Sequence, residues 1–256
     1  LKLGWGVEGV AFATFIAEWL GLFYGLWLAR EGFNNGYWKN WVQIFDRARL
    51  LQMARVNSDI LIRSVLLEIG FVSFLFLGSS FDDATLAANQ VLIQFLFITA
   101  HGMDGFAFAA EALIGQALGA KDRGRLRRSV LLTSFWGAVV IVILTTFFAF
   151  AGGWLIDVMT KAPDVQALAQ EYLFWMVLAP FLGGPSWMLD GIFIGATRTK
   201  DMRNMMLVSF VIYWVSVWML LEPYGNHGLW AALIIFFVAR GVTLAVRYPA
   251  LERAAD

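Results

Sequence analysis

The stretch Ser129–Trp154 constrains the fold of this chain most strongly, because it contains no Asp, Glu, Lys or Arg. A helix that crosses the hydrocarbon core of a bilayer needs about 20 predominantly apolar residues, and this stretch is longer. The whole chain is 60% hydrophobic and 15% charged, whereas a soluble domain contains roughly 45–50% apolar and about 25% charged residues. The excess of apolar residues predicts an all-α, polytopic membrane protein.

Seven stretches are long and apolar enough to be predicted as transmembrane helices. They are Trp5–Ala29, Asp59–Gly78, Ala84–Gly119, Ser129–Trp154, Val165–Thr197, Met205–Leu221 and Leu229–Tyr248. The segment Arg30–Ser58 separates the first two. Its second half mixes aromatic residues with arginines, which fits either an amphipathic helix at the membrane interface or an ordinary solvated linker helix.

The basic residues predict the orientation of the chain. The ends of the seven predicted helices are assigned alternately to the two sides of the membrane. Of the 19 Lys and Arg residues, 17 then fall on one side, and only Lys2 and Lys161 fall on the other. Cytoplasmic loops of membrane proteins carry an excess of Lys and Arg. We therefore expect the basic side, which includes the C-terminus, to be cytoplasmic.

The composition argues against several functional classes. The formal net charge is zero, so no nucleic-acid partner is expected, and the absence of cysteine removes disulfides and thiolate chemistry. The two histidines, His101 and His227, are predicted on different helices or turns, and no nucleophile is paired with a base. We expect no enzyme, no catalytic residue, no cofactor and no metal site. Because the chain begins at Leu1 without a signal peptide, we expect it to be part of a longer protein.

A polar stripe runs along the predicted helix Ala84–Gly119. At 3.6 residues per turn, its members fall within about a third of the helix circumference. They are Gln90, Gln94, His101, Asp104 and Glu111. A charge in hydrocarbon is costly, so the stripe is expected to face protein or water.

Two interpretations of the stripe remain open. In the first, Asp104 and Glu111 exchange protons or bind a cation in a water-lined path, and His101 is spaced to pair with Asp104. In the second, the stripe is a ladder of buried hydrogen bonds that locks helices together. The small residues beside the stripe, which would allow another helix to approach closely, are Gly102, Gly105, Ala109 and Ala110.

Two further acidic residues lie within predicted helices. Glu68 has no basic residue three or four positions later, so a partner would have to come from another helix. Asp190 follows a segment that we expect to break or kink the helix Val165–Thr197, formed by Pro180, Gly183, Gly184 and Pro185. A broken helix would free backbone groups for ions or substrate; alternatively, Asp190 supports the kink. Arg240, in the last predicted helix, is expected to reach the cytoplasmic interface.

Two predicted helices end in similar sequences, IGQALGAKDRGR at 114–125 and IGATRTKDMRN at 194–204. Both pass from Ile-Gly through small residues to Lys-Asp and a basic turn. Parallel repeats of this kind occur in secondary transporters. The similarity suggests such a repeat, although the match is short.

Four segments carry a resemblance to a known family. They are MDGFAFAAEALIGQALGAKD (103–122), NSDILIRS (57–64), MLDGIFIGATRTKDMRN (188–204) and GNHGLW (225–230). Together they resemble the MATE (multidrug and toxic compound extrusion) family, most closely its DinF-like branch. The resemblance implies a fold of twelve transmembrane helices in two six-helix lobes, which exchange substrate for H⁺ or Na⁺ by alternating access.

The resemblance also implies a domain organisation. Residues 1–29 would be the last helix, helix six, of an otherwise missing N-terminal lobe, and 30–58 would be a cytoplasmic or interfacial linker. Residues 59–256 would form the C-terminal six-helix lobe, helices seven to twelve. Some members bind a cation through a glutamate on helix seven and an aspartate on helix ten. Glu68 matches the first position, whereas Asp190 lies about one turn closer to the cytoplasm than the second. Asp104 and Glu111 belong to the DinF-like helix-eight motif.

The expected function is that of a secondary active efflux antiporter in the bacterial inner membrane. It would export lipophilic, often cationic, drugs or toxic metabolites in exchange for H⁺ or Na⁺, with Glu68, Asp104, Glu111 and Asp190 as coupling candidates. Its partners would be membrane lipid, small lipophilic substrates and the missing lobe. Two alternatives remain, a lipid-linked or metabolite flippase of related architecture and a non-transporting membrane assembly protein.

Overall fold

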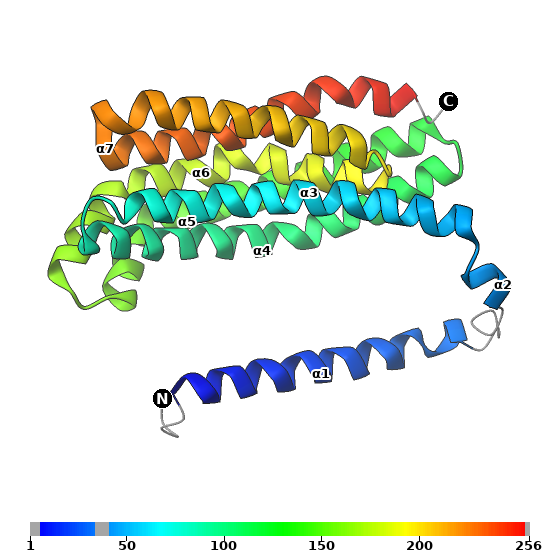
Figure 1. Ribbon diagram of the computed structural model, residues 1–256, viewed down its shortest axis with the longest axis horizontal. Coiled ribbons are helices and arrows are strands. Elements are labelled where there is room, and N and C mark those ends of the chain that lie inside the picture. Colours follow the sequence, from blue (N-terminus) through cyan, green and yellow to red (C-terminus); the bar gives the residue numbers. More distant parts are fainter. Residues whose placement is uncertain (1–5, 34–40, 254–256) are drawn as a thin grey trace. The chain divides into compact units, whose positions relative to one another are not determined.

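The computed structural model describes residues 6–33 and 41–253, and within them every regular element is a helix. The helices are α1 (Gly6–Phe33), α2 (Trp41–Ile44), α3 (Arg47–Gly78), α4 (Asp83–Gly119), α5 (Arg123–Met159), α6 (Pro163–Gly195) and α7 (Thr199–Glu252). The chain divides into two units, Leu1–Ala54 and Arg55–Asp256. Figure 1 shows the helices of each unit.

Six of these helices are long and apolar enough to cross a membrane, so the predicted number of seven is wrong for the described residues. The difference lies in α7, which contains both of the last two predicted segments. Its one non-helical residue is Gly225, with φ 54° and ψ −131°, a conformation that favours glycine. The hydroxyls of Ser209 and Thr243 lie 3.3 Å apart, so the chain reverses direction at Gly225. We call Thr199–Tyr224 and 226–252 the two arms of α7 (Figure 1).

In the first unit, every side chain of α1 that the structure describes is exposed. Its aromatic side chains contact one another along the helix, as Phe15, Trp19 and Phe23 do at centroid distances of 5.8 and 5.7 Å. Residues 34–40 of the predicted linker lie outside the described residues. The rest of the linker consists of the end of α1, helix α2 and the first turns of α3. Asp46 begins α3, because its carboxylate accepts hydrogen bonds from the backbone of Ala48 and Arg49.

In the second unit, α6 lies at the centre and packs against α4, α5 and α7. The core between these helices is rich in aromatic residues. Phe95 stacks on Phe148 at 5.4 Å, and the edge of Phe74 on α3 meets Trp230 at 4.8 Å. Helices α6 and α7 are the most deeply buried, whereas α5 exposes most of its apolar surface, as a lipid-facing helix does.

Two glycines on α6 bring its backbone against that of α4. A Cβ atom at Gly191 would lie 2.5 Å from the carbonyl oxygen of Ala107, and one at Gly195 would lie 2.4 Å from that of Glu111. Such a four-residue spacing of small residues is typical of close helix contacts in membranes. The small residues predicted for this role were on α4, and Gly105 among them has no atom within 4 Å of its Cβ position.

Helix α6 continues through Pro180 and Pro185, so a break, the first of the two predicted alternatives, is wrong, and the kink stays a prediction. The two glycines between the prolines instead allow neighbouring side chains to pack on the helix. A Cβ at Gly184 would lie 2.0 Å from Cδ1 of Ile141, and one at Gly183 would lie 3.4 Å from Phe237. Side chains of α5 and α7 thus pack on the helix where the prolines remove backbone hydrogen bonds.

Helices α4 and α6 end in the same kind of turn. Asp122 N–H donates to Ala117 O at 3.0 Å, and Arg198 N–H donates to Phe193 O at 2.9 Å. The residue before each donor, Lys121 or Thr197, has a φ of 52° or 53°. This pattern is a Schellman motif. The two helix ends that are similar in sequence therefore adopt the same turn. In this turn Gly-Ala-Lys-Asp at the end of α4 corresponds to Gly-Ala-Thr-Arg at the end of α6.

Acidic residues cap the starts of α5 and α4. Asp122 accepts a hydrogen bond from the backbone of Arg125, and Asp82 accepts one from the backbone of Thr85. The bond from Thr85 lowers the pKa of the Asp82 carboxyl below its usual value of 3.8. Because folding lowers this pKa, the cap stabilises the fold at pH values above the usual pKa of the carboxyl. The stabilisation is lost as the pH falls through the lowered pKa of the folded state.

A substitution of Gly195 tests the contact between α4 and α6. We expect Gly195→Ala to lower the thermal midpoint of the purified protein, since overpacking typically costs about 1–3 kcal/mol. Gly105→Ala is the matched control, because its Cβ enters open space and alanine is the better helix former. An unchanged midpoint in Gly195→Ala would show that the two helices are further apart.

Candidate transport site

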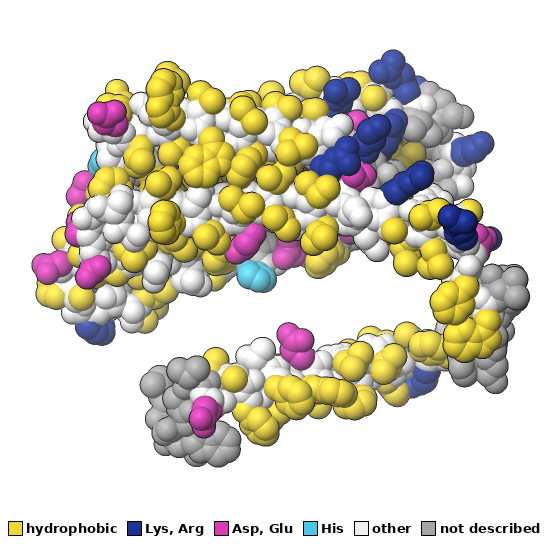
Figure 2. Space-filling model, in the orientation of Figure 1, with side chains coloured by type: hydrophobic (Ala, Val, Ile, Leu, Met, Phe, Trp, Pro, Cys, Tyr) yellow, Lys and Arg dark blue, Asp and Glu magenta, His cyan; other side chains and the backbone are white. Residues whose placement is uncertain are grey.

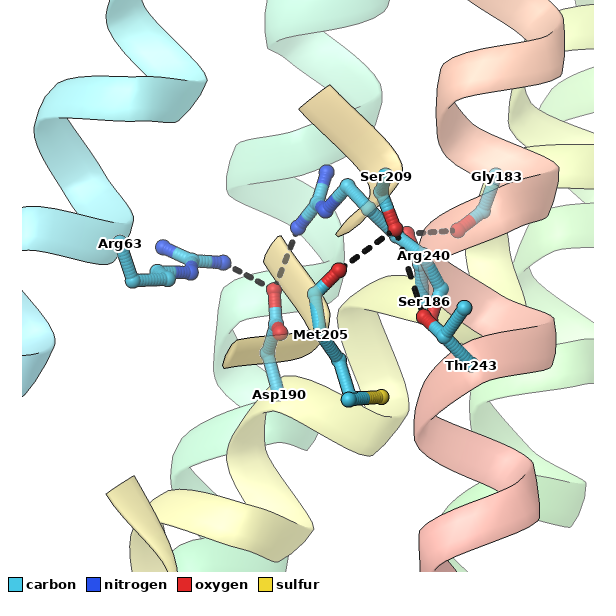
Figure 3. Close-up of polar contacts among 8 residues, drawn as sticks. All are labelled: Arg63, Gly183, Ser186, Asp190, Met205, Ser209, Arg240 and Thr243. Atoms are coloured by element: carbon cyan, nitrogen blue, oxygen red, sulfur yellow. Dashed lines mark hydrogen bonds and ion pairs between the residues drawn. The ribbon is translucent and has the colours of Figure 1, made fainter. Parts of the chain in front are cut away.

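A buried group of three charged side chains joins α3, α6 and α7. Asp190 Oδ2 accepts a hydrogen bond from Arg240 Nη2 at 2.6 Å and a second from Arg63 Nη2 (Figure 3). The Arg240 side chain is only 1% exposed and that of Asp190 8%, whereas that of Arg63 is 16% exposed. Arg240 also lies 5.7 Å from the ring centre of Phe236, a distance typical of a cation–π contact. We call Arg63, Asp190 and Arg240 the charge triad.

The triad differs from the sequence prediction in two ways. Arg240 does not extend to the membrane interface, because it is enclosed within the unit and bound to Asp190. The two arginine partners of Asp190 were also not predicted from the sequence. The two partners lie 50 and 127 residues away in the sequence, so no local spacing indicates the contact.

A row of hydroxyl groups lies beside the triad on α6 and α7 (Figure 3). Ser209 donates a hydrogen bond to the carbonyl of Met205 at 2.8 Å, and its hydroxyl lies 3.3 Å from that of Thr243. Ser186 donates to the carbonyl of Gly183 at 2.7 Å. Each of these hydroxyls has a hydrogen-bond partner on its own helix or on a neighbouring one. The row therefore joins the two arms of α7 next to the ion pairs.

The polar stripe on α4 faces outward from the second unit. Gln90, Gln94, His101 and Asp104 are exposed, and Glu111 is half-buried. Among the described residues no hydrogen bond joins His101 to Asp104; His101 Nδ1 instead donates to the carbonyl of Phe97 at 2.6 Å. The stripe is therefore an accessible polar surface on an otherwise apolar helix.

Glu68 is also exposed, on the face of α3 opposite to the buried Gly70 and Phe74. Apolar side chains surround it in a shallow recess, formed by Val65, Ile69, Val72 and Phe76 together with Ser73. In the described part of the chain, neither Glu68 nor Asp104 has an ion-pair partner. A carboxylate in this position is accessible to a proton or a cation.

The structure thus separates the predicted coupling residues. Glu68 lies on α3, Asp104 and Glu111 lie on α4, and Asp190 lies in the core with its two arginines. Within the residues that the structure describes, no three His, Asp or Glu side chains converge to hold a metal ion.

Two further ion-pair clusters lie near the end of the second unit where Lys and Arg gather (Figure 2). Arg203 binds Asp59 at 2.6 Å, which joins α7 to α3. Glu252 at the end of α7 binds both Arg127 and Arg123 of α5, the latter at 3.4 Å. We call this end of the unit the basic end.

The opposite end of the unit is held by polar contacts of asparagine, tryptophan, histidine and glutamate side chains that were not predicted from the sequence. Asn89 and Asn226 exchange two hydrogen bonds of 2.8 and 3.0 Å, and the Trp230 indole donates to Asn89 at 2.9 Å. His227 accepts a hydrogen bond from Trp175 at 2.9 Å and contacts Glu171 at 3.1 Å. Three of these residues belong to the GNHGLW segment, which was the only feature of the sequence that drew attention to them.

Known proteins share both the sequence and the fold. A sequence model of the MatE family matches residues 60–219. DNA damage-inducible protein F of Escherichia coli (strain K12) is 36% identical over 246 residues, which cover 96% of this chain and 53% of that protein. A probable multidrug resistance protein NorM of Halalkalibacterium halodurans is 25% identical over 72% of this chain and 41% of that protein.

The solved structures agree with the sequence relatives. The chain matches the Vibrio cholerae MATE transporter VcmN in a D35N mutant with a TM-score of 0.81 and 18% identity, over 99% of this chain and 57% of that one. A MATE structure in complex with MaL6 matches with a TM-score of 0.79 and 15% identity, over 98% and 59%. The chain spans about half the length of the curated relatives it matches. The family match and the closely similar relative show that this chain belongs to the MATE family of multi-pass membrane transporters.

Proposed function

We propose that the chain is the C-terminal portion of a secondary active efflux antiporter. It exports lipophilic, often cationic, compounds in exchange for H⁺ or Na⁺ across a bacterial inner membrane. The family membership supports this function, as do relatives whose names describe multidrug resistance proteins. Residues 59–256 form the C-terminal six-helix lobe, 1–29 the last helix of the N-terminal lobe and 30–58 the linker between them. In this arrangement each arm of α7 crosses the membrane, and the basic end is cytoplasmic.

The exposed polar stripe of α4 is the observation that carries the proposal. Charged and amide side chains cannot face lipid tails without a large desolvation cost, yet Gln94, His101 and Asp104 are exposed on this unit. The stripe therefore lines a water-filled cleft toward the other lobe. Asp104 and Glu68, which have no ion-pair partner in the described chain, are the coupling residues, and Glu111 extends the path.

Asp190 has a different role in this proposal. Two guanidinium groups share its Oδ2 atom, and protonation of the carboxylate would remove the negative charge that balances them. Asp190 therefore positions α3 and the second arm of α7 rather than exchanging ions. Pro180, Gly183, Gly184 and Pro185 remain the hinge candidates of α6.

Protonation would drive the cycle through the cost of burying charge. A neutral Asp104 or Glu68 is cheaper to bury than a carboxylate, so proton binding favours the conformation that encloses the residue. Aromatic and methionine side chains in the cleft attract flat, lipophilic cations with little chemical selectivity. Exchange of drug for proton follows if both cannot occupy the cleft together.

Neutralisation of the exposed acids tests this mechanism. We expect Asp104→Asn or Glu68→Gln in the protein with its complete coding sequence to reduce pH-gradient-driven efflux to the level of vesicles without the protein. The amount of inserted protein should not change. Asp164→Asn is the control, because this exposed residue lies in the first turn of α6, far along the helix from the basic end. Wild-type efflux in both variants would refute the coupling role, and the absence of substrate-dependent proton movement in the wild type would favour an assembly protein.

Single cysteines test the path of α7, since the chain has no native cysteine. In intact cells a membrane-impermeant maleimide should label Tyr224→Cys but should reach Lys200→Cys and Arg247→Cys only after permeabilisation. All three side chains are exposed, so burial does not limit the reaction. Labelling of Lys200→Cys and Arg247→Cys from opposite sides would mean that α7 crosses the membrane once.

A further inference from the structure

An open pocket of about 690 Å³ lies where α4 ends and α5 begins. Leu113 of α4 lines one side, and Arg125, Arg128, Ser129 and Leu132 of α5 line the other. Leu113 follows Glu111 by two residues, which is about 200° around a helix. The pocket therefore lies on a different face of α4 from the polar stripe, outside the proposed transport path.

Ser129 is a nearly buried polar side chain that lacks a partner. It lines the pocket and is 8% exposed, and its hydroxyl forms no hydrogen bond with any residue that the structure describes. The hydroxyls of Thr133 and Ser209, by contrast, donate to the carbonyl groups four residues earlier. Because buried polar groups are nearly always hydrogen-bonded, the Ser129 hydroxyl indicates a polar ligand in the pocket.

Two arginines supply positive charge beside this hydroxyl. Arg125 and Arg128 are three residues apart, so they lie on one face of α5, and both are exposed. Arg125 donates a hydrogen bond to Gln116 of α4 at 3.0 Å, whereas Arg128 has no hydrogen bond or ion pair in the described chain. Asp122 is the one acidic residue of the lining, and its Oδ1 already accepts a hydrogen bond from the backbone of Arg125 at 2.8 Å. The Arg128 guanidinium is therefore available to an anion.

The same face of α5 becomes apolar directly beyond the arginines. Residues 129–156 contain no Asp, Glu, Lys or Arg, so Arg128 marks the place where α5 enters the hydrocarbon. Leu132 and Phe135 follow Arg125 and Arg128 by seven residues each, on the same face and about 10 Å deeper. Both are more than half exposed. A soluble anion would contact only the polar half of this surface, whereas a phospholipid would contact both halves.

We propose that this pocket binds one phospholipid with an anionic headgroup. The phosphate accepts hydrogen bonds from the Ser129 hydroxyl and from the guanidinium groups of Arg125 and Arg128. The acyl chains lie along Leu132 and Phe135, in the leaflet that the basic end faces. The lipid joins the end of α4 to the start of α5. This inference depends on α5 crossing a membrane and is independent of the transported substrate.

Native mass spectrometry of the complete transporter tests this site. The protein is purified in a mild detergent and exposed to equal amounts of phosphatidylglycerol and phosphatidylcholine. We expect one phosphatidylglycerol to remain bound to the wild type. The retained fraction should fall severalfold in Arg128→Ala, which removes the unpaired guanidinium, and in Ser129→Ala, which removes the hydroxyl. An excess of glycerol phosphate, which has the phosphate but no acyl chain, should not displace the lipid.

Two matched controls separate the site from general effects of charge and polarity. Arg247→Ala removes an exposed arginine of α7, and Ser134→Ala removes a hydroxyl of α5; both residues lie outside the pocket. Both variants should retain the lipid as the wild type does. The proposal is overturned if the wild type retains the two phospholipids equally or retains neither. It is also overturned if Arg128→Ala loses no more lipid than Arg247→Ala, if Ser129→Ala behaves as the wild type, or if glycerol phosphate displaces the lipid.

Discussion

The cost of burying charge in a membrane protein governs the structure of this lobe. An uncompensated charge in an apolar interior costs several kcal/mol, so Asp190 is buried only with Arg240 and Arg63. These three residues come from α6, α7 and α3. Their contacts therefore tie together helices that are far apart in the sequence, and the positions of α3 and the second arm of α7 depend on them.

The same constraint sorts the acidic residues into two groups. Asp59, Asp190 and Glu252 are bound to arginines within the fold. Asp104 and Glu68 are exposed, on surfaces that would otherwise face lipid. The first group holds helices in place, and the second group supplies the coupling carboxylates of the transport cycle that we propose. A transporter needs both, because a proton affects the conformation only if the scaffold around it has defined alternatives.

Much of this fold is predictable from the sequence, because apolar length and the distribution of Lys and Arg are local properties. The helices α3 to α6, the polar stripe and the basic end follow from them. The charge triad does not, because Arg63 and Asp190 are 127 residues apart. Pro180 and Pro185 predict a break or a kink, and the helix is continuous through both. The reversal at Gly225 occupies a single non-helical residue, so two predicted helices form α7. The role of Gly191 and Gly195 depends on which helix lies opposite, which the sequence does not state.

The most direct test of this account is a double-mutant cycle on Asp190 and Arg240, measured as the free energy of unfolding in mixed micelles. Asp190→Leu leaves two arginines without their carboxylate and should destabilise the protein by about 3–5 kcal/mol. Arg240→Met leaves the pair of Arg63 and Asp190 and should cost less. The double variant leaves only Arg63, the most exposed of the three, and should recover most of the loss. If the effects of the two single substitutions simply add, or if Asp190→Leu is neutral, the triad does not hold the lobe together.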